Sequence, residues 1–154
     1  MSSLRASVRA AASARTAQAE ALYRRAIVIV ERALGPEHPD IAVNLNNLAA
    51  LHHAKQDYGN AELLYRRGLN IKEKTLGFDH PDVATSLNNL AVTLESQGKF
   101  DEAETLYRHA LTIAEKALGP DHPGTLAARK NYQELMDKIH SGVEATASKD
   151  LSRR

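Results

Sequence analysis

The sequence repeats itself with a period of 42 residues, and this period limits what the chain can fold into. Tyr23, Tyr65 and Tyr107 are spaced by that interval, and nearly half of the positions in 19–60 are identical in 61–102. Apolar residues recur within each unit at three- and four-residue steps, which is typical of helices, and no strand pattern accompanies them. Helical repeats of this length stack on one another, so we predict an all-α fold built as a solenoid.

Each unit contains two helices. The apolar period that starts at Pro81 is interrupted at Gly98 and continues to Leu118, where Gly119 favours the left-handed backbone that closes a helix. Proline suits the first turn of a helix, so Pro123 marks the next start. The expected helix pairs are 39–56 with 58–76 and 81–97 with 100–118, followed by one helix from 123 to about 140.

The two ends of the chain differ from the repeats. Residues 1–18 are basic and rich in alanine, and we expect a helical extension that continues as one helix to Leu34, with a degenerate first hairpin as the alternative. The same composition occurs in mitochondrial transit peptides. Residues 19–140 form the repeat array, whose last helix acts as a cap because Arg129 and Gln133 replace apolar residues. We expect 141–154 to be a disordered tail.

Bulk properties exclude several classes of function. The chain has 154 residues, enough for one domain, and a formal net charge of +1, so no overall field attracts it to nucleic acid or anionic membranes. Cysteine is absent, which removes disulfides and thiolate metal sites. No apolar run is long enough for a membrane helix. We therefore expect a cytoplasmic protein without a cofactor or a bound metal.

The sequence lacks the motifs of an enzyme. It contains no Gly-rich phosphate loop and no nucleophile elbow. His38, His80 and His122 recur with the repeat, which places them roughly 10–20 Å apart and too far from one another to hold one metal ion. Each stands just before a proline, so we interpret the histidines as parts of helix starts and predict that the chain is not an enzyme.

Asparagine pairs are the strongest functional signal. Asn46 with Asn47, and Asn88 with Asn89, lie opposite the leucines that face the core. Because asparagine is a poor helix former, two adjacent asparagines in the middle of a helix need a reason. They either bind a partner, since an amide both donates and accepts hydrogen bonds, or hold neighbouring helices together.

The sequences LNNLA, AExLYRRA and LGPxHPD resemble the tetratricopeptide repeat (TPR) of the kinesin light chain type. The resemblance implies a right-handed α-solenoid of helix-turn-helix repeats that binds an extended peptide or partner segment in a concave groove. In that family the groove is lined by the first helix of each repeat, and kinesin light chain grooves take tryptophan-acidic peptides. The groove residues implied here are Asn46, Asn47, Ala50, His53, Asn88, Asn89, Val92, Glu95, Lys130 and Asn131, and Glu134 lies along the same face.

Self-assembly is the alternative function. The helix 19–34 is apolar on more than one side, and nothing well formed precedes it in register. An uncovered face of this kind usually marks an interface, so we expect two copies to pair in a two-fold dimer. The residues expected at this oligomer interface are Leu22, Ala26, Ile27, Ile29 and Val30.

Overall fold

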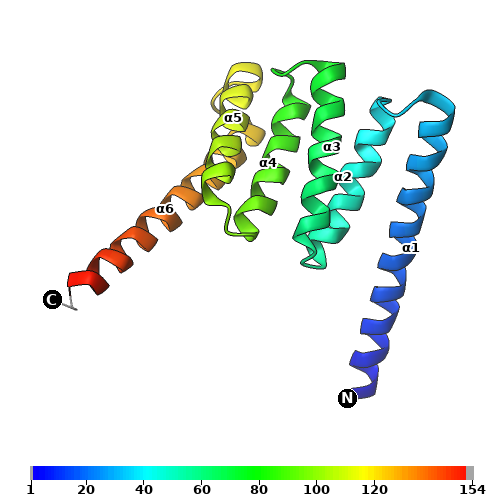
Figure 1. Ribbon diagram of the computed structural model, residues 1–154, viewed down its shortest axis with the longest axis horizontal. Coiled ribbons are helices and arrows are strands. Elements are labelled where there is room, and N and C mark those ends of the chain that lie inside the picture. The colour runs from blue at the N-terminus through cyan, green and yellow to red at the C-terminus, as the bar shows by residue number, and fades with distance from the viewer. Residues whose placement is uncertain (1, 152–154) are drawn as a thin grey trace. The chain divides into compact units, whose positions relative to one another are not determined.

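The computed structural model describes the backbone of residues 2–151 and the side chains of residues 5–142. The described chain consists of six α-helices joined by short turns, and residues 2–151 contain no strand (Figure 1). The all-α prediction is therefore confirmed. Contacts group the chain into two compact units, Met1–Thr75 and Leu76–Arg154, each with a core of its own.

The first unit is built from α1 (Ser2–Leu34), α2 (Pro39–Ala54) and α3 (Tyr58–Leu76). In Figure 1, α1 (blue) and α2 (cyan) run side by side. Apolar residues from all three helices meet in one cluster, because the apolar period places them on the faces that point toward one another. The buried members of the cluster are Ile27, Ile41, Ala42, Leu45, Leu48 and Ile71.

A glycine allows α3 to pack closely on α2. Gly68 is buried, and a Cβ added there would lie 2.8 Å from the Oδ1 of Asn46 and 3.5 Å from the carbonyl oxygen of Ala42. The same position of the following repeat is Ala110, which is also buried. Small side chains at this place therefore set the distance between the two helices of a repeat.

Polar contacts tie α1 to the end of α2. His52 is buried, its Nδ1 lies 2.8 Å from Asp57 Oδ2, and its Nε2 lies 3.3 Å from a guanidinium nitrogen of Arg24. Glu20 on α1 accepts hydrogen bonds from Lys55 at 2.6 Å and from Arg24 at 3.0 Å. The pKa of Glu20 is lowered from its ordinary value by these two bonds, the bond from Lys55 first.

The second unit is built from α4 (Pro81–Ser96), α5 (Phe100–Leu118) and α6 (Pro123–Leu151). The helix α5 packs against both α4 and α6. Thr125 in the first turns of α6 is buried, and its hydroxyl donates a hydrogen bond of 3.1 Å to the carbonyl oxygen of Ala114 on α5. The largest fully buried side chains of this unit are Val83, Leu87, Leu90, Thr93, Leu94, Tyr107, Ile113, Thr125 and Leu135.

Two equivalent turns share one backbone conformation but place different residues at its left-handed position. Gln56 after α2 has a φ of 62°, and Gly98, at the same place in the next repeat, has a φ of 75°. Both turns make the same backbone hydrogen bonds: the N–H of Asp57 bonds to the carbonyl of His52, and that of Lys99 to the carbonyl of Leu94, each at 2.9 Å. The left-handed conformation is easy for glycine and strained for glutamine.

The helices at the two ends of the described chain are long. α1 is a single helix from Ser2 to Leu34. α6 runs past His140, where the apolar period ends, and continues to Leu151. No proline interrupts the sequence there, and a helix can continue without an apolar face. Residues 152–154 lie outside the described residues.

One side of α6 carries polar residues. Gln133 is exposed, and Arg129 pairs with Glu115 of α5 at 2.7 Å. These are the two residues that the sequence predicts for a capping helix, because both replace apolar residues of the preceding repeat.

Candidate functional site

The candidate site lies in the second unit, on the side of α4 that faces away from the core. Leu87 and Leu90 are buried, and this turns Asn88 and Asn89 to the opposite side of the helix, where both are half-buried. Asn131 of α6 donates a hydrogen bond of 2.8 Å from Nδ2 to the Oδ1 of Asn88. The first helices of two successive repeats are therefore joined through their amides.

About two turns further along α4, three helices meet at Glu95. Its carboxylate accepts a hydrogen bond of 2.9 Å from the hydroxyl of Tyr107 on α5, and a second bond from the ammonium group of Lys138 on α6. Burial raises the pKa of Tyr107, and the bond to Glu95 raises it further. The bond to Glu95 also raises the pKa of Lys138. Neutral tyrosine and charged lysine are thus the forms that the carboxylate stabilises.

An opening of about 470 Å³ lies beside this carboxylate, and we call it the Glu95 pocket. Its wall combines carboxylate, amide and hydroxyl groups with apolar surface, which is the composition of a specific binding site. The volume suits one or two amino-acid side chains of a partner. The pocket is lined by Val92, Glu95, Ser96, Phe100, Tyr107, Asn131, Glu134 and Lys138.

The structure places the expected groove residues of the second unit at or near this pocket. Val92, Glu95 and Asn131 line it, and Asn88 is bonded to Asn131 at its edge. Lys130 is exposed and lies 3.7 Å from Glu134, which belongs to the lining. Asn89 is half-buried outside the lining.

The expected groove residues of the first unit lie on α2 and differ in exposure. Asn47 and Ala50 are exposed. Asn46 is half-buried against Gly68 of α3, so it takes part in helix packing. His53 lies edge-on to the ring of Tyr58, with the ring centres 5.0 Å apart.

Four lining residues were not expected from the sequence: Ser96, Phe100, Tyr107 and Lys138. The apolar period assigned Tyr107 to the core, which is correct for its ring, but the period carries no information on where the hydroxyl ends. Lys138 did leave a signal, because it follows Asn131 and Glu134 by seven and four residues and so shares their face of the helix.

The three repeated histidines begin helices. The Nδ1 atoms of His38, His80 and His122 accept hydrogen bonds from the backbone N–H two residues later, at 3.3, 3.1 and 3.0 Å. Each imidazole therefore caps the N-terminus of α2, α4 or α6. Within the described residues no group of three or more histidine, aspartate or glutamate side chains is arranged to hold a metal ion.

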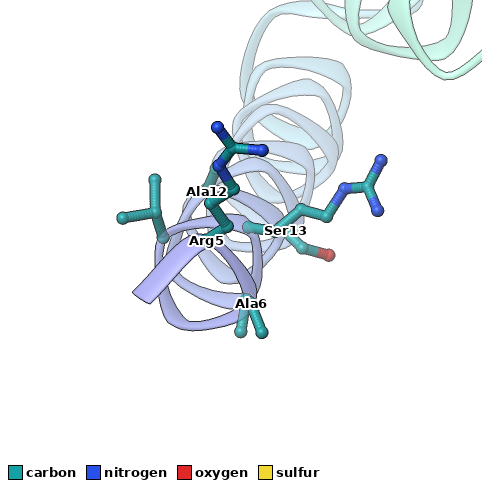
Figure 2. Close-up of a pocket in the computed structure, with 7 residues that line it drawn as sticks. Arg5, Ala6, Ala12 and Ser13 are labelled. Atoms are coloured by element: carbon teal, nitrogen blue, oxygen red, sulfur yellow. The ribbon is translucent and has the colours of Figure 1, made fainter. Parts of the chain in front are cut away.

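A second hollow is drawn in Figure 2 and lies at the N-terminal end of α1. Its lining residues all fall between Arg5 and Ser13 of this one helix. The labelled side chains of Arg5, Ala6 and Ser13 point outward around the helix, and no other element faces them in the view. We therefore do not treat it as a binding site.

The expected oligomer interface on α1 is exposed only in part. Leu22 and Ile29 are 60% and 56% exposed, and Ala26 is half-buried. Ile27 is buried in the core cluster and Val30 packs against it, so these two residues belong to the face toward α2. The expected set therefore divides between two sides of α1, because an apolar pattern on several sides of a helix does not reveal which side is covered.

Two family models that describe the tetratricopeptide repeat match the sequence, one over residues 1–74 and the other over residues 83–124. The chain is a tetratricopeptide repeat (TPR) protein. The match over residues 83–124 is as long as the repeat period. Together the two matches cover nearly all of the helices α1 to α5.

Solved structures narrow the type of TPR. A point-mutant form of a Podosopora anserina kinesin light chain with nearly identical TPR-like repeats matches with a TM-score of 0.71 and 25% identity, over 92% of this chain and 67% of that chain. Another structure of these repeats gives 0.69 and 26% identity, over 88% and 64%. BtubC (BKLC) from P. vanneervenii shares the fold, with a TM-score of 0.64 and 21% identity over 89% and 59%.

This TPR protein is thus of the kinesin light chain type, and the predicted α-solenoid of helix-turn-helix repeats is confirmed. It spans 67%, 64% and 59% of the length of the three solved chains. No curated protein matches its sequence. TPR repeats are typically non-catalytic and bind protein partners. No helix in the described part of the chain has both the length and the hydrophobicity to cross a membrane.

Proposed function

We propose that this TPR protein is a non-catalytic scaffold that binds an extended segment of a partner protein on the amide-bearing face of its repeats. The observation that carries the proposal is the Glu95 pocket, where α4, α5 and α6 supply hydrogen-bonding groups to one opening beside the Asn88–Asn131 pair. Amides serve an extended peptide well, because they bond to its backbone whatever its side chains are. The same face recurs on α2, where Asn47 and Ala50 are exposed.

Peptide selection followed by calorimetry tests the proposal. A displayed library of twelve-residue peptides is panned on the full chain, and the enriched peptides are titrated against the wild type and the Asn47→Ala/Asn89→Ala double variant. Loss of two backbone hydrogen bonds should weaken binding at least about tenfold. Asn70→Ala, an exposed asparagine on α3, is the matched control and should leave the affinity unchanged.

Two results would contradict the proposal that the amide-bearing face binds a peptide. One is the failure of any peptide to bind after panning. The other is equal affinity in the double variant and the wild type while the melting temperature is preserved, which would show that these amides do not contact the peptide.

Self-association through α1 is the second candidate function, and one comparison within the chain favours it. Ile29 is 56% exposed, whereas Ile71 and Ile113, at the same place in the two following repeats, are 3% and 2% exposed. α3 is preceded by α2 and α5 by α4, so each is the second helix of a hairpin. Residues 19–34 occupy the equivalent place in α1, but residues 5–18 before them continue the same helix and do not form a separate one.

A second copy of this chain is the occupant that we propose for the open face. Val8, Ala11, Leu22, Ala26 and Ile29 share one side of α1, and Val8 is 62% exposed. Two antiparallel α1 helices that cross between Arg15 and Gln18 would place Ala11 opposite Leu22 and Val8 opposite Ala26. Small residues would thus meet large ones on a self-complementary surface, as a two-fold interface requires.

Light scattering after size exclusion at tens of micromolar decides this second candidate. The wild type should elute with the mass of a dimer, and Leu22→Glu/Ile29→Glu should elute as a monomer. Leu63→Glu is the control, since Leu63 is 67% exposed on α3, outside the proposed interface. A monomeric wild type, or a double variant that stays dimeric, would reject the pairing.

A further inference from the structure

The carboxylate of Glu95 and the ammonium group bound to it differ in how firmly they are held. The Glu95 side chain is 16% exposed and is fixed from behind by the hydroxyl of Tyr107. The Lys138 side chain is 63% exposed and reaches Glu95 from the surface of α6. An ion pair with one exposed and flexible partner contributes little to stability, so the lysine can leave while the carboxylate stays in place.

The remaining wall of the pocket suits a cation with an apolar stem. Val92 is half-buried, and Phe100 is 41% exposed and presents an aromatic surface. Lysine and arginine side chains bury their methylene groups on such surfaces and keep the charge at a polar end. A second carboxylate, that of Glu134, lines the same opening and pairs only loosely, at 3.7 Å, with the exposed Lys130.

We propose that the Glu95 pocket binds a lysine or arginine side chain of the partner segment, and that Lys138 occupies the carboxylate until this cation displaces it. The inference rests on the proposed function, because it supplies the anchor residue of the same bound segment. An acidic segment of the kind implied by the kinesin light chain resemblance would meet both carboxylates of the pocket unfavourably. The anchor belongs to this unit, since the same repeat position of the first unit holds His53.

Capped amino acids are suitable probes, because they test the pocket without a partner. Four probes are titrated into the ¹⁵N-labelled full chain, each acetylated on its α-nitrogen and closed by a methylamide at its carboxyl group, with the side chain left free. They are derivatives of lysine, arginine, norleucine and glutamate. The two basic probes should shift amide signals of residues 92–100 and 131–138 with saturation. Norleucine, which has the stem without the charge, and glutamate should bind more weakly.

Two substitutions with opposite effects make the test specific. Lys138→Met removes the resident cation and should raise the affinity for the basic probes at least about threefold. Glu95→Gln removes the carboxylate but keeps an acceptor for Tyr107, and it should abolish the saturable shifts. Lys116→Met is the matched control, because it deletes an equal charge from an exposed pair with Asp79 elsewhere in the unit, and it should change nothing.

The outcomes separate this inference from the function on which it rests. Tighter binding of the glutamate probe, or unchanged affinity in Lys138→Met, would overturn the basic anchor. If selected peptides bind through the asparagines but show no dependence on Glu95, the scaffold stands and the anchor fails. If the basic probes bind as expected and no peptide does, the pocket stands and the peptide-binding function fails.

Discussion

Asn131 donates a hydrogen bond of 2.8 Å to Asn88, and this bond joins α6 to α4 across the interval of one repeat. Both side chains are half-buried. The sequence left two roles open for the adjacent asparagines, holding helices together and binding a partner. Asn88 performs the first role within the second unit, through its bond to Asn131. The pair borders the Glu95 pocket, so the same amides also set the shape of the proposed binding surface.

The Asn88–Asn131 bond predicts a coupled effect on stability. Asn88→Ala and Asn131→Ala should each lower the free energy of unfolding by about 1 kcal/mol. The loss in the double variant should be smaller than the sum of the two single losses, by about 0.5–1.5 kcal/mol. Urea denaturation of the four proteins measures this cycle. Strictly additive effects would show that the bond contributes nothing in solution.

The turn after α2 offers a stabilising substitution. Gln56 has a φ of 62°, where the equivalent residue is Gly98 with a φ of 75°. Gln56→Gly should raise the free energy of unfolding by about 0.5–1 kcal/mol, because glycine adopts this conformation without strain. Gly98→Ala should lower it by about 1 kcal/mol. Thermal and urea denaturation measure both, and a destabilised Gln56→Gly would disprove the assigned strain.

Tyr107 predicts a loss of stability in alkaline solution. Burial and the Glu95 bond raise its pKa above the ordinary value of 10.0, so the folded state keeps the proton that the unfolded state loses. The contribution of Tyr107 is therefore complete below pH 10.0 and is lost as the pH rises above that value. Tyr107→Phe should be less stable at pH 7 and show a shallower decline between about pH 9 and 11, measured by urea denaturation. An unchanged slope would contradict this.

Glu20 predicts the opposite pH dependence. Hydrogen bonds from Lys55 and Arg24 lower its pKa from the ordinary value of 4.5, so its contribution is complete above pH 4.5 and is lost as the pH falls through the folded-state value. Glu20→Gln should lower stability at pH 7 and reduce the loss on acidification. Glu62→Gln, at the same repeat position with its pair to Arg66, is the control and should have a smaller effect. Equal effects would argue against the α1–α2 link.

Much of the fold could be predicted because each helix carries its own start signal. α2, α4 and α6 begin at the expected prolines, and α3 and α5 begin at Tyr58 and Phe100, each two residues after the left-handed turn residue. What could not be predicted depends on neighbours. The pattern of α1 is apolar on several sides, and only the packing against α2 shows that Ile27 is covered and Ile29 is not.

The candidate site was predictable as a face but not as a pocket. The spacing of Asn88, Val92 and Glu95 along α4 follows from helix geometry alone. The partners of Glu95 come from other helices, and the reach of the Tyr107 hydroxyl and the Lys138 ammonium depends on distances between helices that no sequence period contains.

The imidazole caps of α2, α4 and α6 give three helices the same start. A side chain that accepts a hydrogen bond from the first turn satisfies a backbone donor that has no partner inside the helix, and this contributes about 1 kcal/mol to helix stability. Each copy of the repeat therefore carries the start of its own first helix, and a further copy added by duplication would bring that start with it.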